Sequence, residues 1–349
     1  MRDPVTDLRR IAFLLERRHS STYRVRAFRT AANVLAGRDD LDLLARNKGL
    51  TSLKGVGDTT AKVVLQSLAG DEPAYLRELE DTAGEPSAEA EKSGIPAIPV
   101  LEGAAAELRA ALKGDCHSHS DWSDGGSPIE EMALTARDLG HQYLVLTDHS
   151  PRLTVANGLS ADRLRRQLEV VAEINTRLAP FRILTGIEVD ILDDGSLDQH
   201  EDLLASLDLV VASVHSKLKM PHAEMTERML TAVANPHVDV LGHCTGRMVT
   251  GSRKRPESAF DSDAVFAACA EYDTAVEVNS RPERLDPPRR LLRDAVEAGC
   301  RFSLDTDAHA PGQLDWLPYG CSRAAECEVP LERVINTWTA TELLDWTGD

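Results

Sequence analysis

Residues 114–126 read GDCHSHSDWSDGG, with His117 and His119 one residue apart and Asp124 in the glycine-rich turn that follows. In an extended strand, side chains two residues apart point to the same face. Imidazole and carboxylate groups that share a face are the side chains that bind transition metals. Such a pair of histidines also occurs without a metal, so the interpretation depends on the rest of the chain.

From residue 112 onward, apolar strand-like segments alternate with amphipathic helical ones, and most of the strand-like segments end in potential metal ligands. The later segments QYLVLTDH, RILTGIEVDI, LDLVVASVH, VDVLGHC and CRFSLDTDAH contribute His149, Glu188, His215, His243, Asp307 and His309. With GDCHSH included, six of seven strands end in this way and use six of the 11 histidines. Scattered surface residues would not favour strand ends so regularly, and the pattern therefore predicts a metal centre.

The number and types of these ligands indicate more than one ion. The nine candidates are His117, His119, Asp124, His149, Glu188, His215, His243, Asp307 and His309. Zinc binds about four N and O ligands, so nine suit two or three ions that share a carboxylate. Mixed imidazole and carboxylate ligands favour Zn, Mn or Fe over Mg or Ca.

Clustered divalent cations bind the oxygens of a phosphate ester and activate water for in-line attack on phosphorus. Hydrolysis of a phosphate ester is therefore the leading chemistry, and amide hydrolysis or deamination in a metal barrel is the weaker alternative. The residues expected to act most directly in catalysis are Glu188, Asp307 and His149.

Other polar side chains near the same strand ends are candidates for binding the substrate phosphate. Lys217 follows His215, Arg247 follows His243, and Asn279 and Arg281 lie at the end of the sixth strand, which lacks a ligand. The alternative for each cation is a salt bridge to one of the many nearby acidic residues.

Seven strand–helix units in about 240 residues predict a closed parallel α/β barrel rather than an open sheet. The carboxyl ends of the strands in such a barrel face one mouth, where active sites form. The 349 residues allow this barrel and one smaller domain.

Residues 1–70 are predicted to form a separate, helical domain. Leu8, Ile11 and Leu14 form an apolar stripe at helical spacing, and residues 22–35 repeat the pattern. The segment has 13 Lys and Arg against 7 Asp and Glu, a net charge of +6. The remainder of the chain has a net charge of −24, which gives −18 for the whole chain. A basic head favours binding to a polyanion, and a small helical domain that is basic on one face for no such reason is the alternative.

The remaining boundaries follow from composition. Residues 71–111 lack a sustained period and are predicted to be a linker, which leaves residues 112–349 for the barrel. No apolar run approaches the ~20 residues of a membrane span, and the N-terminus lacks an apolar signal core. The six cysteines form no CxxC pair. We therefore expect a cytoplasmic location with reduced thiols.

The ordered pattern HxH, TDH, GxE, SVH, GH and DxDAH resembles the PHP (polymerase and histidinol phosphatase) family over residues 112–345. The stretches LTVANGLSADRL, GIEVDILDDGSLD, LGHCTGR and RPERLD are similar to the PHP domain at the C-terminus of bacterial family X DNA polymerases. The resemblance implies a distorted (β/α)7 barrel with a trinuclear site, in a branch associated with manganese-dependent nuclease activity. It implies one metal at His117, His119, Glu188 and Asp307, a second at Glu188, His215 and His243, and a third at Asp124, His149 and His309.

The head resembles the same branch. SLKGVGDTTAKVV looks like a helix-hairpin-helix, and TYRVRAFRTAANVL is similar to the 8-kDa domain of family X polymerases. Gly55 and Gly57 permit a tight turn, so backbone amides at the next helix start would face a DNA phosphate. The expected contacts, salt-sensitive and largely independent of DNA sequence, are Arg24, Arg26, Arg29, Lys54, Gly55, Gly57 and Lys62. The position of the lyase lysine falls on Val63, so lyase activity is not expected.

Between head and barrel, only about 40 residues intervene, fewer than the ~50 that a domain such as a polymerase palm needs. They contain no Asp-x-Asp pattern, so no polymerase activity is expected. The favoured function is a metal-dependent phosphoesterase that acts on DNA, as a 3′-5′ exonuclease or an abasic-site endonuclease. The alternatives are a small-molecule phosphatase similar to histidinol phosphatases and a DNA-binding module with a structural barrel.

Overall fold

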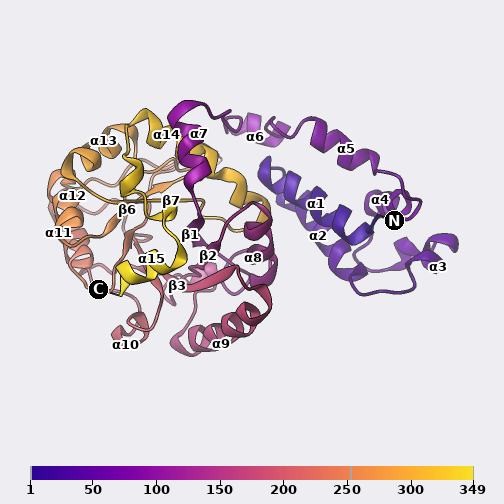
Figure 1. The fold of residues 1–349 in the computed structure, drawn as a ribbon, viewed down its shortest axis with the longest axis horizontal. Coiled ribbons are helices and arrows are strands. Elements are labelled where there is room, and N and C mark those ends of the chain that lie inside the picture. Colours follow the sequence, from indigo (N-terminus) through magenta and orange to yellow (C-terminus); the bar gives the residue numbers. More distant parts are fainter. Residues whose placement is uncertain (1, 252–253, 349) are drawn as a thin grey trace. The chain divides into compact units, whose positions relative to one another are not determined.

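The computed structural model describes residues 2–251 and 254–348, and the chain divides into two compact units, residues 1–98 and 99–349. The first unit is all-helical, as predicted. Its elements are α1 (Pro4–Arg17), α2 (Thr22–Leu35), α3 (Leu41–Arg46), the 3-10 turn η1 (Leu50–Ser52), α4 (Asp58–Leu68), α5 (Ala74–Asp81) and α6 (Ala88–Lys92) (Figure 1). Among the described residues, no helix is both long and apolar enough to cross a membrane.

The apolar stripe of α1 forms the centre of this unit. Asp3 begins the helix, because its carboxylate accepts hydrogen bonds from the amides of Val5 and Thr6. Leu8 and Ile11 are fully buried and pack in one cluster with apolar residues of α2 and α4. The helical spacing of apolar residues in the sequence therefore identified the face of α1 that is buried.

The segment predicted to be a linker, residues 71–111, is largely helical. Leu76 and Leu79 of α5 are 2% and 8% exposed and belong to the core of the first unit. α7 (Gly103–Ala111) instead packs on the second unit, where Leu108 joins the main apolar core. The boundary between the units therefore falls after Ile98. Helices this short bury only one or two apolar residues each, which is too few to show a period in the sequence.

The second unit is the predicted parallel barrel. Its sheet has the order β1-β2-β3-β4-β5-β6-β7, and every neighbouring pair in that order is parallel. The strands are β1 (Gly114–Ser118), β2 (Tyr143–Leu146), β3 (Arg182–Asp190), β4 (Leu209–Ser213), β5 (Val240–Leu241), β6 (Ala275–Asn279) and β7 (Phe302–Asp305).

Helices surround the strands (Figure 1). They are α8 (Ile129–Asp138), α9 (Ala161–Leu178), α10 (Glu201–Leu204), α11 (His222–Val233), α12 (Ser262–Glu271), α13 (Arg289–Ala298) and α14 (Leu317–Glu326). The remaining elements are η2 (Thr154–Ala156), η3 (Pro311–Trp316), η4 (Leu331–Arg333), η5 (Ile335–Thr337) and α15 (Ala340–Thr347).

The two-residue period of the strands separates core from site. Leu184 of β3 belongs to an apolar cluster that Leu343 of α15 also joins. Glu188 lies four residues further along β3, on the same face but nearer the carboxyl end. The inner face is therefore apolar at the amino ends of the strands and carries the ligand candidates at the carboxyl ends.

The placement of α5 gives a first prediction. In a fragment of residues 1–98, Leu76→Ala should lower the free energy of unfolding by about 2–4 kcal/mol, because it opens a cavity in a packed core. Urea unfolding followed by circular dichroism measures the change. The matched control is Leu65→Ala in α4, where the side chain is 46% exposed. Equal stabilities for the two variants would show that α5 does not belong to the core.

Candidate metal centre

Glu188 is 1% exposed and lies at the centre of the site. Its two carboxylate oxygens face five imidazoles that come from the carboxyl ends of four strands, β1, β2, β4 and β5. The distances are 2.8 Å to His243 Nε2, 2.9 Å to His149 Nδ1, 3.2 Å to His215 Nε2, 3.3 Å to His117 Nε2 and 3.5 Å to His119 Nε2. The parallel barrel produces this convergence, because each strand brings its carboxyl end to the same mouth.

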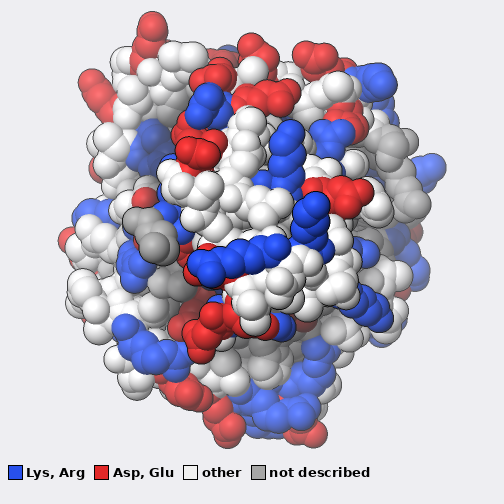
Figure 2. All heavy atoms as spheres, turned by 90° about the vertical axis from the view of Figure 1, so that its right-hand side faces the viewer, with Lys and Arg blue, Asp and Glu red and all other residues white. Residues whose placement is uncertain are grey.

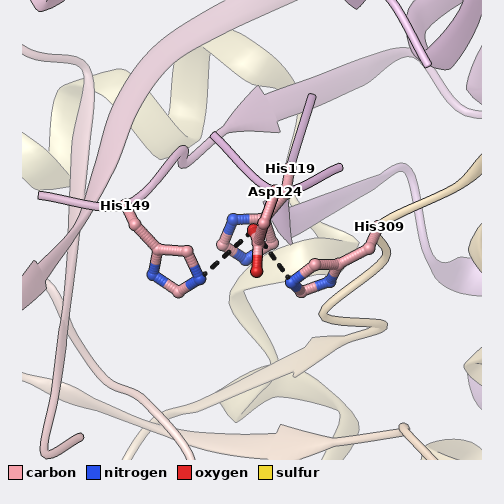
Figure 3. A group of neighbouring side chains, drawn as sticks. All are labelled: His119, Asp124, His149 and His309. Carbon is pink, nitrogen blue, oxygen red and sulfur yellow. Dashed lines mark ion pairs between the residues drawn. The ribbon is translucent and has the colours of Figure 1, made fainter. Parts of the chain in front are cut away.

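A second group lies next to it. Asp124, in the loop after β1, has one carboxylate oxygen 3.6 Å from His149 Nε2 and 3.4 Å from His309 Nε2 (Figure 3). His119 lies between these side chains, and its Nε2 is also 3.5 Å from Asp307. All nine predicted ligands therefore meet in one place.

These residues fit divalent transition-metal ions. Three sets have potential ligand atoms within 4.8 Å of one another: His119, Asp124, His149 and His309; His117, His119 and Glu188; and His149, Glu188 and His215. Several buried atoms of the cluster form no hydrogen bond among the described residues, although some of them lie close to a carboxylate oxygen. The atoms without such a bond are His117 Nε2, both ring nitrogens of His119, His149 Nδ1, Glu188 Oε2, His215 Nε2 and His243 Nδ1. Leaving one buried polar atom unpaired costs about 1–3 kcal/mol, so a cluster of them favours a bound cation.

The electrostatics of the site favour anionic carboxylates. Burial alone would raise the pKa of Glu188, but the neighbouring His117, His215 and His149 hold that pKa well below its usual range. Burial opposes the charge on His215, yet Glu188 and Asp190 raise the pKa of this histidine to about 9. Protons and metal ions therefore compete for the same nitrogen.

Two carboxylates that sequence reasoning missed hold the histidines in place. Glu277 of β6 accepts a hydrogen bond from His117 Nδ1 at 2.6 Å and another from the backbone amide of His243. Asp190 accepts from His215 Nδ1. Such carboxylates fix the tautomer and orientation of a metal-binding histidine. The signal in the sequence was a charged residue inside the apolar strand AVEVN, on the face that also carries Asn279.

The four residues predicted to bind substrate have different surroundings in the structure. Arg281 lies beside the site, with Nη1 3.3 Å from His309 Nδ1, and Asn279 Nδ2 is 3.2 Å from Asp307. Lys217 forms an ion pair of 2.6 Å with Asp193 at the rim.

Arg247 has partners within the protein, and its contact with substrate stays a prediction. Its guanidinium donates to the carbonyl oxygens of Arg284 and Leu285 and forms an ion pair with Glu257. It therefore stabilises the loop after β6. That loop carries Arg284, which the sequence analysis did not select and whose Nε is 3.1 Å from Asp307.

The hairpin of the first unit has the predicted glycine geometry. Gly55 has φ of 102°, and a Cβ atom there would lie 2.7 Å from Thr30 Cγ2, so any other residue would be strained. Gly57 is the N-cap of α4. Arg26, Lys54 and Lys62 are exposed.

Two of the predicted DNA contacts have other partners. Arg29 is buried and paired with Glu16 at 2.7 Å, so we remove it from the expected DNA surface. Arg24 forms an exposed ion pair with Glu89. On the face seen in Figure 2, Lys and Arg side chains lie among Asp and Glu side chains. That face is therefore not uniformly basic, and any attraction to a polyanion there would come from particular Lys and Arg side chains.

Each of the two units matches a known protein family. Residues 115–281 match the family model of the PHP domain, and residues 2–72 match that of a helix-hairpin-helix domain. A probable phosphatase of Thermoanaerobacter sp. (strain X514) is 31% identical over 234 residues, which are 64% of this chain and 89% of that protein. The chain belongs to the PHP family. As a PHP protein with this cluster, it is a hydrolase that acts on phosphate ester bonds.

Two further proteins are similar to this PHP chain. DNA polymerase/3'-5' exonuclease PolX of Bacillus subtilis is 40% identical over 225 residues, which are 64% of this chain but only 39% of that protein. A crystal structure of histidinol phosphate phosphatase from Lactococcus lactis, complexed with zinc, L-histidinol and phosphate, matches with a TM-score of 0.46 and 18% identity, over 62% of this chain and 92% of that one.

The contacts of Glu277 predict a role in metal binding. Glu277→Gln keeps the size of the side chain but removes the charge that orients His117, and should weaken metal affinity about 10–100-fold. Isothermal titration of the metal-free protein with Mn²⁺ measures the affinity. The control is Glu297→Gln at an exposed position of α13. Unchanged affinity in Glu277→Gln, with the fold intact, would contradict the role.

The raised pKa of His215 predicts a pH dependence. Metal binding needs the neutral imidazole, so affinity should rise as pH increases toward 9, by up to about tenfold per pH unit for each displaced proton. Calorimetry in buffers of different ionisation enthalpy should detect the released proton. Asp190→Asn removes one cause of the raised pKa and should shift the dependence to lower pH. Affinity that stays constant between pH 7 and 9 would overturn the assignment.

Proposed function

We propose that the chain is a metal-dependent phosphoesterase that acts on DNA, either as a 3′-5′ exonuclease or as an abasic-site endonuclease, without polymerase activity. The observation that carries the proposal is the buried Glu188 carboxylate among five imidazoles, in a chain that also has a helix-hairpin-helix unit. Two or three Mn, Zn or Fe ions would occupy the cluster, with the nine predicted residues as ligands.

When bound, such ions polarise a phosphate ester and lower the pKa of water for in-line attack on phosphorus. The chain's own residues supply the rest. Glu188 and Asp307 hold negative charge in a buried site, and Glu277 and Asp190 orient the imidazoles beside them. Arg281 and Asn279 lie close enough to the cluster to bind a phosphate oxygen or to orient Asp307.

The hairpin supports DNA as the substrate. The amides at the start of α4 and the exposed side chains of Arg26, Lys54 and Lys62 offer contacts to the phosphate backbone without reading bases. The similarity to the B. subtilis protein, whose printed name includes 3'-5' exonuclease, supports the same choice.

The second candidate is a small-molecule phosphatase. It is favoured by the Thermoanaerobacter relative, which is named a probable phosphatase and of which the barrel-containing part of this chain covers 89%. The two functions differ in whether the first unit contributes to turnover, and an assay can separate them.

The test is cleavage of end-labelled single-stranded, gapped and abasic DNA by the Mn²⁺-loaded protein. His149→Ala should lower the rate by about 100-fold or more, because His149 contacts both Glu188 and Asp124. A fragment of residues 99–349 should keep kcat, raise KM and lose much of the salt dependence of binding.

The matched control for His149→Ala is His200→Ala, which removes an exposed histidine of the same unit and should leave cleavage unchanged. Rapid release of phosphate from small esters, with no cleavage of any DNA, would favour the phosphatase instead. Turnover of neither substrate class in Mn²⁺, Zn²⁺ or Fe²⁺ would contradict both functions.

A further inference from the structure

The barrel closes between β1 and β7, and this junction separates two pairs of predicted ligands. His117 and His119 belong to the carboxyl end of β1, whereas Asp307 and His309 follow β7. Between β3 and β4, by contrast, five consecutive residue pairs are in register. Between β1 and β7, the bridge between Ser118 and Ala308 is isolated. Near this bridge the amide of His119 donates to the Ala308 carbonyl at 2.8 Å, and buried side chains add further contacts across the rest of the junction.

Two buried carboxylates replace part of the missing ladder. Asp305 of β7 accepts a hydrogen bond from the backbone amide of Cys116 at 2.8 Å. In return, Asp115 of β1 accepts from the amide of Thr306 at 3.3 Å and from its hydroxyl. Each strand thus offers a side chain to the backbone of the other, and both carboxylates are fully buried.

Asn336 of η5 contacts the same junction on the side away from the predicted ligands, near Gly114 and Leu304. Its side-chain oxygen accepts from the amide of Leu304 at 2.7 Å, and its Nδ2 lies 3.0 Å from the Leu304 carbonyl oxygen and 3.3 Å from that of Gly114. The same Nδ2 donates to Asp305 at 2.9 Å, and the Asn336 carbonyl accepts from the amide of Lys113 at 2.7 Å. Buried Asn336 therefore adds a third set of side-chain contacts that join the backbones of β1 and β7.

We propose that Asn336 is a positioning residue that sets the spacing between the β1 and β7 ligand pairs, and through it the affinity for the ions that draw ligands from both strands. The inference rests on the metal-binding role given under Proposed function. It assigns a function in the site to η5, a segment from which none of the predicted ligands comes.

The arrangement makes the effect selective. The set His119, Asp124, His149 and His309 takes ligands from both sides of the junction, whereas the set His149, Glu188 and His215 takes them from the ends of β2, β3 and β4. A wider junction displaces His309 relative to His119 and leaves the second set joined by regular ladders.

The test is the metal content and affinity of Asn336→Ala in the full chain. We expect one class of Mn²⁺ sites to weaken about tenfold or more, as when a residue that orients metal ligands is lost, and another to stay within threefold of the wild type. Titration against a competing chelator gives the affinities, and mass spectrometry of the retained metal gives the number of ions. Loss of cleavage should follow the lost ion and be restored by excess Mn²⁺.

The chain contains a matched control. Asn175 of α9 makes the same kind of reciprocal bond, to the amide and the carbonyl of Ile183, each at 2.8 Å, but away from the junction. Asn175→Ala should keep all sites within threefold. An equal loss in both variants, or unchanged affinities in folded Asn336→Ala, would overturn the proposal.

If Asn336→Ala does not fold, Thr306→Val decides, because it removes the hydroxyl bonded to Asp115 with little change of shape. Selective weakening in that variant supports the proposal, and unchanged affinities contradict it. A wild-type protein that binds no metal would instead refute the proposed function, which distinguishes the two failures.

Discussion

A buried carboxylate among imidazoles is the interaction on which the rest of the barrel depends. The neighbouring histidines hold the pKa of Glu188 well below its usual range although the side chain is withdrawn from water, and a charge buried without compensation would cost more than a domain's whole stability. The compensation comes from side chains that are far apart in sequence, such as His117 and His243. The parallel barrel supplies it by bringing the carboxyl ends of several strands to one point.

This constraint divides each strand by function. On β3, the inner face is apolar at Leu184 and anionic at Glu188, within four residues. The apolar half stabilises the barrel through burial, and it offsets the cost of assembling the polar half above it. At the junction of β1 and β7 this division fails, because Asp115 and Asp305 are buried polar residues that replace backbone pairing. Their side chains are satisfied there, which makes the exception tolerable.

The fold could be predicted from the sequence, and so could the clustering of the nine candidate ligands, because both leave local patterns. Alternation of strands and helices gives the barrel, and the last residues of a parallel strand must lie at its mouth. The interaction partners of individual side chains leave no such local pattern. The sequence shows that Arg247 and Arg29 are cations, but their acceptors, such as Glu16, come from other elements. Glu277 and Asn336 were missed because their roles depend on groups 160 and more than 200 residues away.

Under the proposed function, the division of the chain into two units has a consequence for specificity. The hairpin contacts the DNA backbone without reading bases, and the metal cluster acts on a phosphate without recognising a sequence. Neither unit then selects a sequence, and selectivity must come from DNA shape: a strand end, a gap or an abasic site that lets a phosphate reach the buried cluster. Tethering raises the local concentration of phosphates around the barrel, which increases the rate at low substrate concentration. Such an arrangement predicts cleavage that depends on the local structure of the DNA and not on its base sequence. The burial of Glu188, which is 1% exposed below the mouth of the barrel, agrees with this expectation.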